Sequence, residues 1–255
     1  MNAITPTQRA ILAGQSVHHR LRVKSVADGM ARSERAIKAS TNQKLGKKVT
    51  KGKWAGFRIF TLTLEERATC PPSCLHWADC YGNHMLNATR YVADAALIDQ
   101  IESDLTELQR KYPRGFLVRL HVLGDFYSVE YVAQWARWLG MFPALHVYGY
   151  TANQPDATDN KERAIGQAVL GLRLACDGRF AVRFSGSKTT DNAALSYDDA
   201  DARQLVADKR AFVCPTQISK HTGQLAKRGE PTRAASCGDC AACWQSKKPV
   251  VFHTH

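Results

Sequence analysis

Short strand-forming segments alternate with helical patterns along most of the chain, and this alternation restricts the possible folds more than any other feature. Runs rich in β-branched and aromatic residues predict strands at 57–64, 116–124, 145–152, 180–187 and 211–217. Parallel strands need crossover connections, usually helices, and such connections are right-handed. We therefore expect an α/β protein with a parallel (β/α) TIM-like barrel, partial or closed, whose functional face lies at the carboxyl ends of the strands.

Amphipathic patterns indicate where the intervening helices lie. Between residues 87 and 111, apolar side chains recur at steps of three and four, which predicts a helix. A second helix should start after Ser128, whose hydroxyl can cap its first turn. Further helices are expected near 161–170 and 198–209. Residues 1–40 can form helix as well, whereas the polar residues 41–53 predict a hinge.

The length and charge distribution favour one large domain with a basic extension. We expect a basic N-terminal extension over 1–53, a barrel-like domain over 54–213 and a cysteine-rich metal-binding segment over 214–255. No apolar run reaches the roughly 18 residues that a membrane span needs, and the first thirty residues lack a signal-peptide pattern. These features predict a cytoplasmic protein without membrane contact.

The positive charge gathers near the N-terminus. The chain carries a net charge of +12, and residues 1–56 hold twelve Lys or Arg against only Asp28 and Glu34. A cationic segment attracts polyanions, because neutralising phosphates releases condensed counterions. Nucleic acid, either DNA or RNA, is the expected partner, although such a segment can also be a solvated tail that aids solubility. The candidate contacts are Lys44, Lys47, Lys48, Lys51 and Lys53.

Seven of the eight cysteines gather in two clusters, and only Cys176 stands alone. In a reducing compartment, clustered thiols indicate metal binding rather than disulfides. The later cluster comprises four residues whose spacing suits tetrahedral zinc or a four-iron cluster: Cys214, Cys237, Cys240 and Cys243. His253 or His255 could replace one of these ligands.

The earlier cluster has only three thiols, those of Cys70, Cys74 and Cys80. A metal with three protein ligands keeps an open position for substrate, water or a cofactor, which is typical of catalytic centres. Two alternatives remain open. His76 or His84 could complete a structural zinc site, or the two clusters could jointly bind one metal.

Polar residues follow three successive predicted strands, at the edge where α/β enzymes hold their ligands. Asp125 is the first choice for a catalytic role, although Gly124 and Asp125 can also simply form a turn. Because strand ends of this kind meet at one edge, the candidate cofactor-binding residues are Gly124, Asp125, Thr151, Asn153 and Ser185.

Several motifs together resemble the phage-associated gene product 88 family. They are TCPPSC, CYG, RLHVLGDFYSVEYVAQW, HVYGYTA, RFSGS and the closing CPTQ, CGDCAACW and VVFHTH, which span residues 55–255. This resemblance implies a phage or mobile-element origin.

Two remoter resemblances suggest chemistry. The order of the three-cysteine loop and the Gly124–Asp125 turn is similar to radical SAM enzymes, although here the spacing is C-x3-C-x5-C and GD replaces the usual GGE. This likeness implies a [4Fe–4S] cluster on the early cysteines and S-adenosylmethionine as a possible cofactor. The late cysteines with His253 resemble the zinc site of guanine transglycosylases, in which a carboxylate such as Asp125 would attack the sugar.

The function expected from these patterns is that of an iron–sulfur, radical-SAM-like enzyme that modifies nucleic acid, since this hypothesis uses both clusters. One alternative is a zinc-containing guanine or deazaguanine base-exchange enzyme. Another is a zinc-bearing nucleic-acid-binding protein without enzyme activity.

Overall fold

The computed structural model describes residues 22–29, 34–77, 80–85, 87–186, 190–227 and 229–253. Its main feature is an eight-stranded sheet in which all neighbouring strands run parallel except the first pair. The strands in spatial order are β2 (Lys38–Ala39), β3 (Arg58–Thr61), β5 (Phe116–Leu120), β6 (Leu145–Thr151), β7 (Phe180–Ser185), β8 (Ala193–Ser196), β10 (Val250–Phe252) and β9 (Phe212–Val213).

The mixed α/β architecture with a mostly parallel sheet confirms the coarse prediction. The edge strands β2 and β9 do not pair with each other among the described residues, so the sheet is open and a closed barrel is not formed. Strands β8 and β10 were not predicted from the sequence. Their sequences, AALS and VVF, do not alternate apolar with polar residues, whereas β3 lies within the alternating run 57–64.

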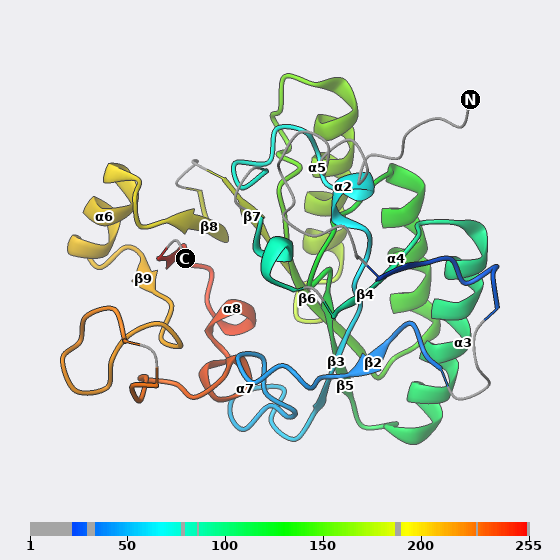
Figure 1. Ribbon diagram of the computed structural model, residues 1–255, viewed down its shortest axis with the longest axis horizontal. Coiled ribbons are helices and arrows are strands. Elements are labelled where there is room, and N and C mark those ends of the chain that lie inside the picture. The colour runs from blue at the N-terminus through cyan, green and yellow to red at the C-terminus, as the bar shows by residue number, and fades with distance from the viewer. Residues whose placement is uncertain are drawn as a thin grey trace.

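Three long helices cover one face of the sheet (Figure 1). They are α3 (Ala95–Lys111), α4 (Val129–Met141) and α5 (Asn160–Ala175). Side chains of Asp94, Ser128 and Asp159 accept hydrogen bonds from backbone N–H groups of the first turns, so the predicted cap at Ser128 is confirmed. Helix α3 begins later than its apolar pattern suggested, because residues 89–91 form strand β4 (Thr89–Tyr91). No described helix is both long and apolar enough to cross a membrane.

The opposite face of the sheet is covered by two segments that are far apart in sequence. One is the stretch 44–57, and the other contains the short helices α7 (Cys237–Cys240) and α8 (Ala242–Gln245) (Figure 1). Their side chains pack on the sheet through Val49, Trp54, Ala241 and Trp244, all buried. The N–H groups of Cys237 and Gly238 donate to the carbonyls of Lys44 and Leu45 at 2.7 and 3.0 Å.

Residues 41–53, expected to form a polar hinge, are therefore folded against the sheet and the C-terminal segment. The hinge prediction came from their polar composition, which does not reveal that Leu45 and Val49 are buried. Helix α6 (Ala200–Ala207) corresponds to the helix expected near 198–209 and packs beside β8 and β10.

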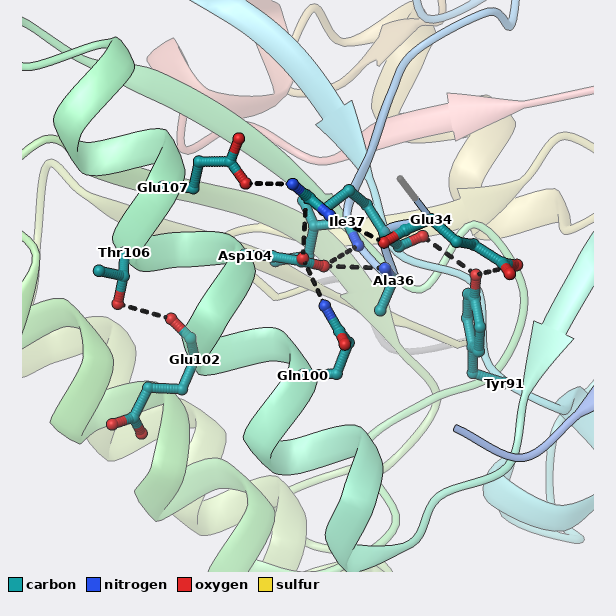
Figure 2. Close-up of polar contacts among 10 residues, drawn as sticks. Glu34, Ala36, Ile37, Tyr91, Gln100, Glu102, Asp104, Thr106 and Glu107 are labelled. Atoms are coloured by element: carbon teal, nitrogen blue, oxygen red, sulfur yellow. Dashed lines mark hydrogen bonds and ion pairs between the residues drawn. The ribbon is translucent and has the colours of Figure 1, made fainter. Parts of the chain in front are cut away.

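The helix suggested for residues 1–40 does not form where the structure describes this stretch. Residues Arg22–Lys24 form β1, which pairs with β4, and Lys38–Ala39 form β2; residues 1–21 and 30–33 lie outside the described part. Tertiary hydrogen bonds explain the extended conformation. Figure 2 shows the buried Asp104 of α3 accepting the N–H groups of Ala36 and Ile37, at 2.8 and 2.9 Å.

Candidate metal centre

All seven clustered cysteines line one cavity of about 400 Å³ on the sheet face opposite the long helices. Three come from the loop after β3, one follows β9, and three lie on α7 and α8. The eighth cysteine, Cys176, does not line this cavity and instead packs against the main core. The fold therefore gathers into one chamber the residues that the sequence separates into two clusters.

The early cysteines lie in a loop that is held by a buried ion pair. Helix α2 (Glu66–Thr69) ends directly before Cys70, and the Cys80 sulfur accepts the Gly82 N–H at the start of the short 3-10 helix η1 (Tyr81–His84). Arg90 Nε lies 2.7 Å from Glu66 Oε2, and both side chains are almost completely buried. The other Arg90 nitrogens donate to the carbonyls of Gly82, Met85 and Ala88 at 2.9–3.1 Å. Arg90 thus fixes the chain just after Cys80.

Burial and mutual repulsion determine the charge state of the early thiols. Burial raises the pKa of the Cys70 thiol well above its usual range, and the neighbouring Asp125, Cys74 and Cys80 raise it further. Burial likewise raises the pKa of Cys74 to about 11. Without a metal these thiols stay protonated at neutral pH. Metal binding would therefore have to displace protons, as it does at thiolate sites generally.

The Gly124–Asp125 turn is bonded directly to the start of the early cysteine loop. Gly124 has a φ of +86°, and a Cβ there would lie 2.6 Å from Leu64 Cβ and 2.7 Å from Thr69 Oγ1. Glycine is therefore required at this position both for conformation and for space. The Asp125 N–H donates to Thr69 Oγ1 at 3.2 Å, immediately before Cys70.

The carboxylate of Asp125 connects two strand ends and does not line the cavity. Its Oδ1 accepts the Phe126 N–H at 2.7 Å, and its Oδ2 accepts the Ala152 N–H at 2.6 Å. Burial raises the pKa of Asp125 to about 6, although these and other hydrogen bonds oppose the shift. The geometry gives Asp125 a positioning role, and a catalytic role for it stays a prediction.

The other candidate cofactor-binding residues fall into two groups, those that line the cavity and those that are buried outside it. Gly124 and Ser185 line the cavity, whereas Thr151 and Asn153 are buried outside its wall. The side-chain Nδ2 of Asn153 donates to the Phe126 carbonyl at 3.0 Å, and the backbone N–H of Asn153 donates to Thr151 Oγ1 at 3.1 Å. These two residues brace the turn that carries Asp125.

A left-handed residue between α7 and α8 shapes the late cysteine group. Ala241 has a φ of +60° and is completely buried, a conformation that is strained for a residue with a Cβ. Ser236 caps α7 by accepting the Asp239 N–H. Because the chain turns at Ala241, both Cys240 and Cys243 reach the cavity.

The four late thiols lie within electrostatic reach of one another. Burial raises the pKa of Cys237 to about 12, and Cys243 and Cys214 contribute to the shift, while Arg119 and Lys44 oppose it. Two hydroxyl groups also contact the sulfurs: Tyr150 Oη lies 3.1 Å from Cys243 Sγ, and Thr216 Oγ1 lies 3.1 Å from Cys214 Sγ.

Two strand arginines stand close to the late cysteines. Arg119 lies over the rings of Tyr148 and Tyr150, 5.5 and 4.7 Å from their centroids. Arg183 is completely buried and donates to the carbonyls of Cys243, Ser246 and Lys248. Neither arginine forms an ion pair with any carboxylate in the described part of the chain. Neither arginine was among the candidate site residues predicted from the sequence, although Arg183 belongs to the polar residues at the end of its predicted strand.

The seven cysteine thiols are donors that suit thiophilic metals. Their side chains are, however, not positioned around a common point as ligands would be. In the described ranges, no three or more His, Cys, Asp or Glu side chains are arranged as a metal-binding group, so coordination would require some of these side chains to move. His76 and His253 line the cavity. The His253 ring packs against the Tyr197 ring, with 4.2 Å between the ring centroids. The side chain of His84 and all of His255 lie outside the described residues.

The lysines predicted to contact nucleic acid share one segment beside α7. Lys47, Lys48, Lys51 and Lys53 are exposed, whereas Lys44 is half-buried and lines the cavity. The buried Val49 and Trp54 hold this segment on the sheet, so the four exposed charges are displayed from a fixed backbone.

The fold and the cavity define an α/β protein with a mostly parallel sheet and a cysteine-lined chamber. The family model for gene product 88 matches residues 35–246, and the chain belongs to this family. The match includes residues 35–54, which precede the range 55–255 of the resemblance seen in the sequence.

Two curated relatives are phage proteins. The Gene 88 protein of Mycobacterium phage D29 is 26% identical over 158 residues, which cover 62% of this chain and 63% of the relative. The Gene 88 protein of Mycobacterium phage L5 is 27% identical over 146 residues, 57% of each chain. The chain thus spans about three fifths of the length of these relatives. No solved structure matches it.

Proposed function

We propose that the chain is an iron–sulfur enzyme that modifies nucleic acid in the cytoplasm, with its reactive cluster on Cys70, Cys74 and Cys80. The observation that supports this proposal most strongly is the three-thiol group at the carboxyl ends of the strands, opening onto the shared cavity. Three protein ligands leave one iron open for a ligand such as S-adenosylmethionine. When bound, such a cluster supplies an electron to that ligand.

The protein's own residues would hold the reacting groups in place. The Glu66–Arg90 pair fixes the loop beyond Cys80, and Thr69 ties Cys70 to the Gly124 turn. A cavity of about 400 Å³ falls in the range of small-ligand sites, roughly 300–1,000 Å³. A chamber of this size excludes a duplex. A base in a strand would therefore have to leave its stack to react.

A variant with four lysines replaced by alanine should bind nucleic acid more weakly, and its affinity should depend less steeply on salt concentration. The four lysines are Lys47, Lys48, Lys51 and Lys53. Each lysine that neutralises a phosphate of a single strand contributes about 0.7 to the slope of log K against log salt concentration. Loss of four contacts should therefore reduce the slope by about 3. Titrations of a fluorescent single-stranded oligonucleotide at several salt concentrations measure this change.

A matched control removes four exposed positive charges elsewhere on the surface. The residues are Lys111, Arg114, Lys161 and Lys220. Their replacement should lower the slope much less than the first variant does. Equal effects of the two variants would mean that binding follows overall charge only, and the nucleic-acid surface assigned to residues 47–53 would be wrong.

The structure gives less support to a base-exchange enzyme that uses Asp125 as its nucleophile. Such a residue must present a free carboxylate oxygen to the substrate. Here both oxygens accept backbone N–H groups, and the side chain lies outside the cavity wall. The iron–sulfur proposal needs no such role for Asp125.

A further inference from the structure

We infer that Cys214, Cys237, Cys240 and Cys243 bind a second metal centre, a closed site of four thiolates for zinc or an iron–sulfur cluster. This centre is separate from the one assigned to Cys70, Cys74 and Cys80, and it would exist even if the chain had no enzyme activity. Four cysteine ligands leave no open position, which is typical of structural zinc sites and of clusters that do not bind substrate.

The backbone around these cysteines is held in position by several independent contacts. The Cys214 N–H donates to the Val251 carbonyl at 2.8 Å, and the Cys237 N–H donates to the Lys44 carbonyl at 2.7 Å. The Cys243 carbonyl accepts from Arg183 Nε at 3.0 Å. Buried Ala241 keeps its strained left-handed conformation between α7 and α8. Strain of this kind persists where the surrounding structure requires it, and it is concentrated at functional sites.

The positive side chains around the four late cysteines favour an anionic centre between the thiols. A fully buried cation without a counter-charge is costly, yet Arg183 has only carbonyl partners among the described residues. Arg119 and Lys44 line the same cavity, and Arg119 lies over the ring of Tyr150, whose hydroxyl contacts Cys243. Four thiolates around one divalent ion leave a net charge of −2, as do four thiolates around a four-iron cluster that carries +2. A dianionic metal centre would therefore neutralise these cations.

Hydroxyl groups next to the sulfurs supply the outer contacts that metal-bound thiolates use. Tyr150 and Thr216 contact Cys243 and Cys214, each at 3.1 Å. The buried Tyr148 hydroxyl lies near Cys237 and has no hydrogen-bond partner at normal distance in the described part of the chain. Hydrogen bonds to metal ligands fix their orientation and tune the metal, and their loss commonly costs 10–100-fold in affinity.

The test removes the first group so that only the second can bind metal. In the full chain carrying Cys70→Ser, Cys74→Ser and Cys80→Ser, anaerobic loading with zinc, with cobalt or with iron and sulfide should give one centre per chain. Cobalt should give the visible absorption of tetrahedral thiolate coordination, and iron with sulfide should give broad absorption if the site takes a cluster. Adding Cys237→Ser and Cys240→Ser should abolish binding in every case.

Two further variants separate the proposal from nonspecific effects. Cys176→Ser should leave metal content unchanged, because this thiol lies away from the cavity. Arg119→Gln should weaken cobalt binding by about tenfold while leaving far-UV circular dichroism unchanged. Absence of any bound metal in the folded triple-serine protein would overturn this inference, and so would full metal content after Cys237 and Cys240 are replaced. Either result leaves the proposal for the first three cysteines standing.

Discussion

Replacement of Arg183 by methionine is expected to lower the free energy of unfolding by several kcal/mol, because each buried carbonyl left without its donor costs roughly 1–3 kcal/mol. The methionine can fill much of the space but donates no hydrogen bonds. The carbonyls of Cys243, Ser246 and Lys248 would then be left buried without their donor. The whole segment that carries Cys243 should detach more easily from the sheet.

Urea denaturation of the two proteins under identical metal conditions measures this effect. Hydrogen exchange should increase first in residues 242–248, because their anchor is lost. Arg137→Met is the matched control: Arg137 pairs with Glu102 at the surface and is half exposed, so its loss should cost less than about 1 kcal/mol. An Arg183 variant as stable as this control would show that the arginine does not anchor the C-terminal segment.

Replacement of Arg90 by methionine should have a comparable effect on the early cysteine loop, about 3–5 kcal/mol. It leaves the Glu66 carboxylate buried without its partner and removes three hydrogen bonds to carbonyls of the chain after Cys80. Cys80 should consequently react faster with a thiol reagent in the metal-free protein, while Cys176 should react at its original rate.

A double variant tests whether the ion pair itself accounts for the loss. Glu66→Gln together with Arg90→Met removes both charges, so the double variant should be more stable than Arg90→Met alone. If Glu66→Gln gives no recovery of stability, the cost arises from the lost carbonyl contacts and not from an unpaired carboxylate. Unchanged Cys80 reactivity in Arg90→Met would contradict the role of Arg90 in holding the loop.

The sequence predicted the part of the fold that depends on local periodicity. Strands β3, β5, β6 and β7 and helices α3, α4 and α5 each carry a long enough pattern to be recognised. The short strands β8 and β10 do not, and the extended course of residues 34–39 depends on Asp104, which lies 67 residues beyond Ile37. A contact over that separation leaves no local signal.

The candidate site shows the same division between local and long-range information. The cysteine spacing marked all seven cysteines that line the cavity, but nothing in the spacing showed that the two groups share it. Arg119 and Arg183 were not predicted as site residues although a signal was present. Each occupies the fourth position of a largely apolar strand, FLVRL and FAVRFS, where a charge needs a buried partner.

Metal and sulfide analysis of the native chain, purified without oxygen or chelators, tests the central claim most directly. Two centres per chain are expected, and acid-labile sulfide with broad visible absorption should report iron at the Cys70, Cys74 and Cys80 group. Zinc alone at both groups would favour a nucleic-acid-binding protein without iron–sulfur chemistry. A folded native chain that contains neither iron nor zinc in stoichiometric amounts would contradict the assignment of the cysteine-lined cavity as a metal site.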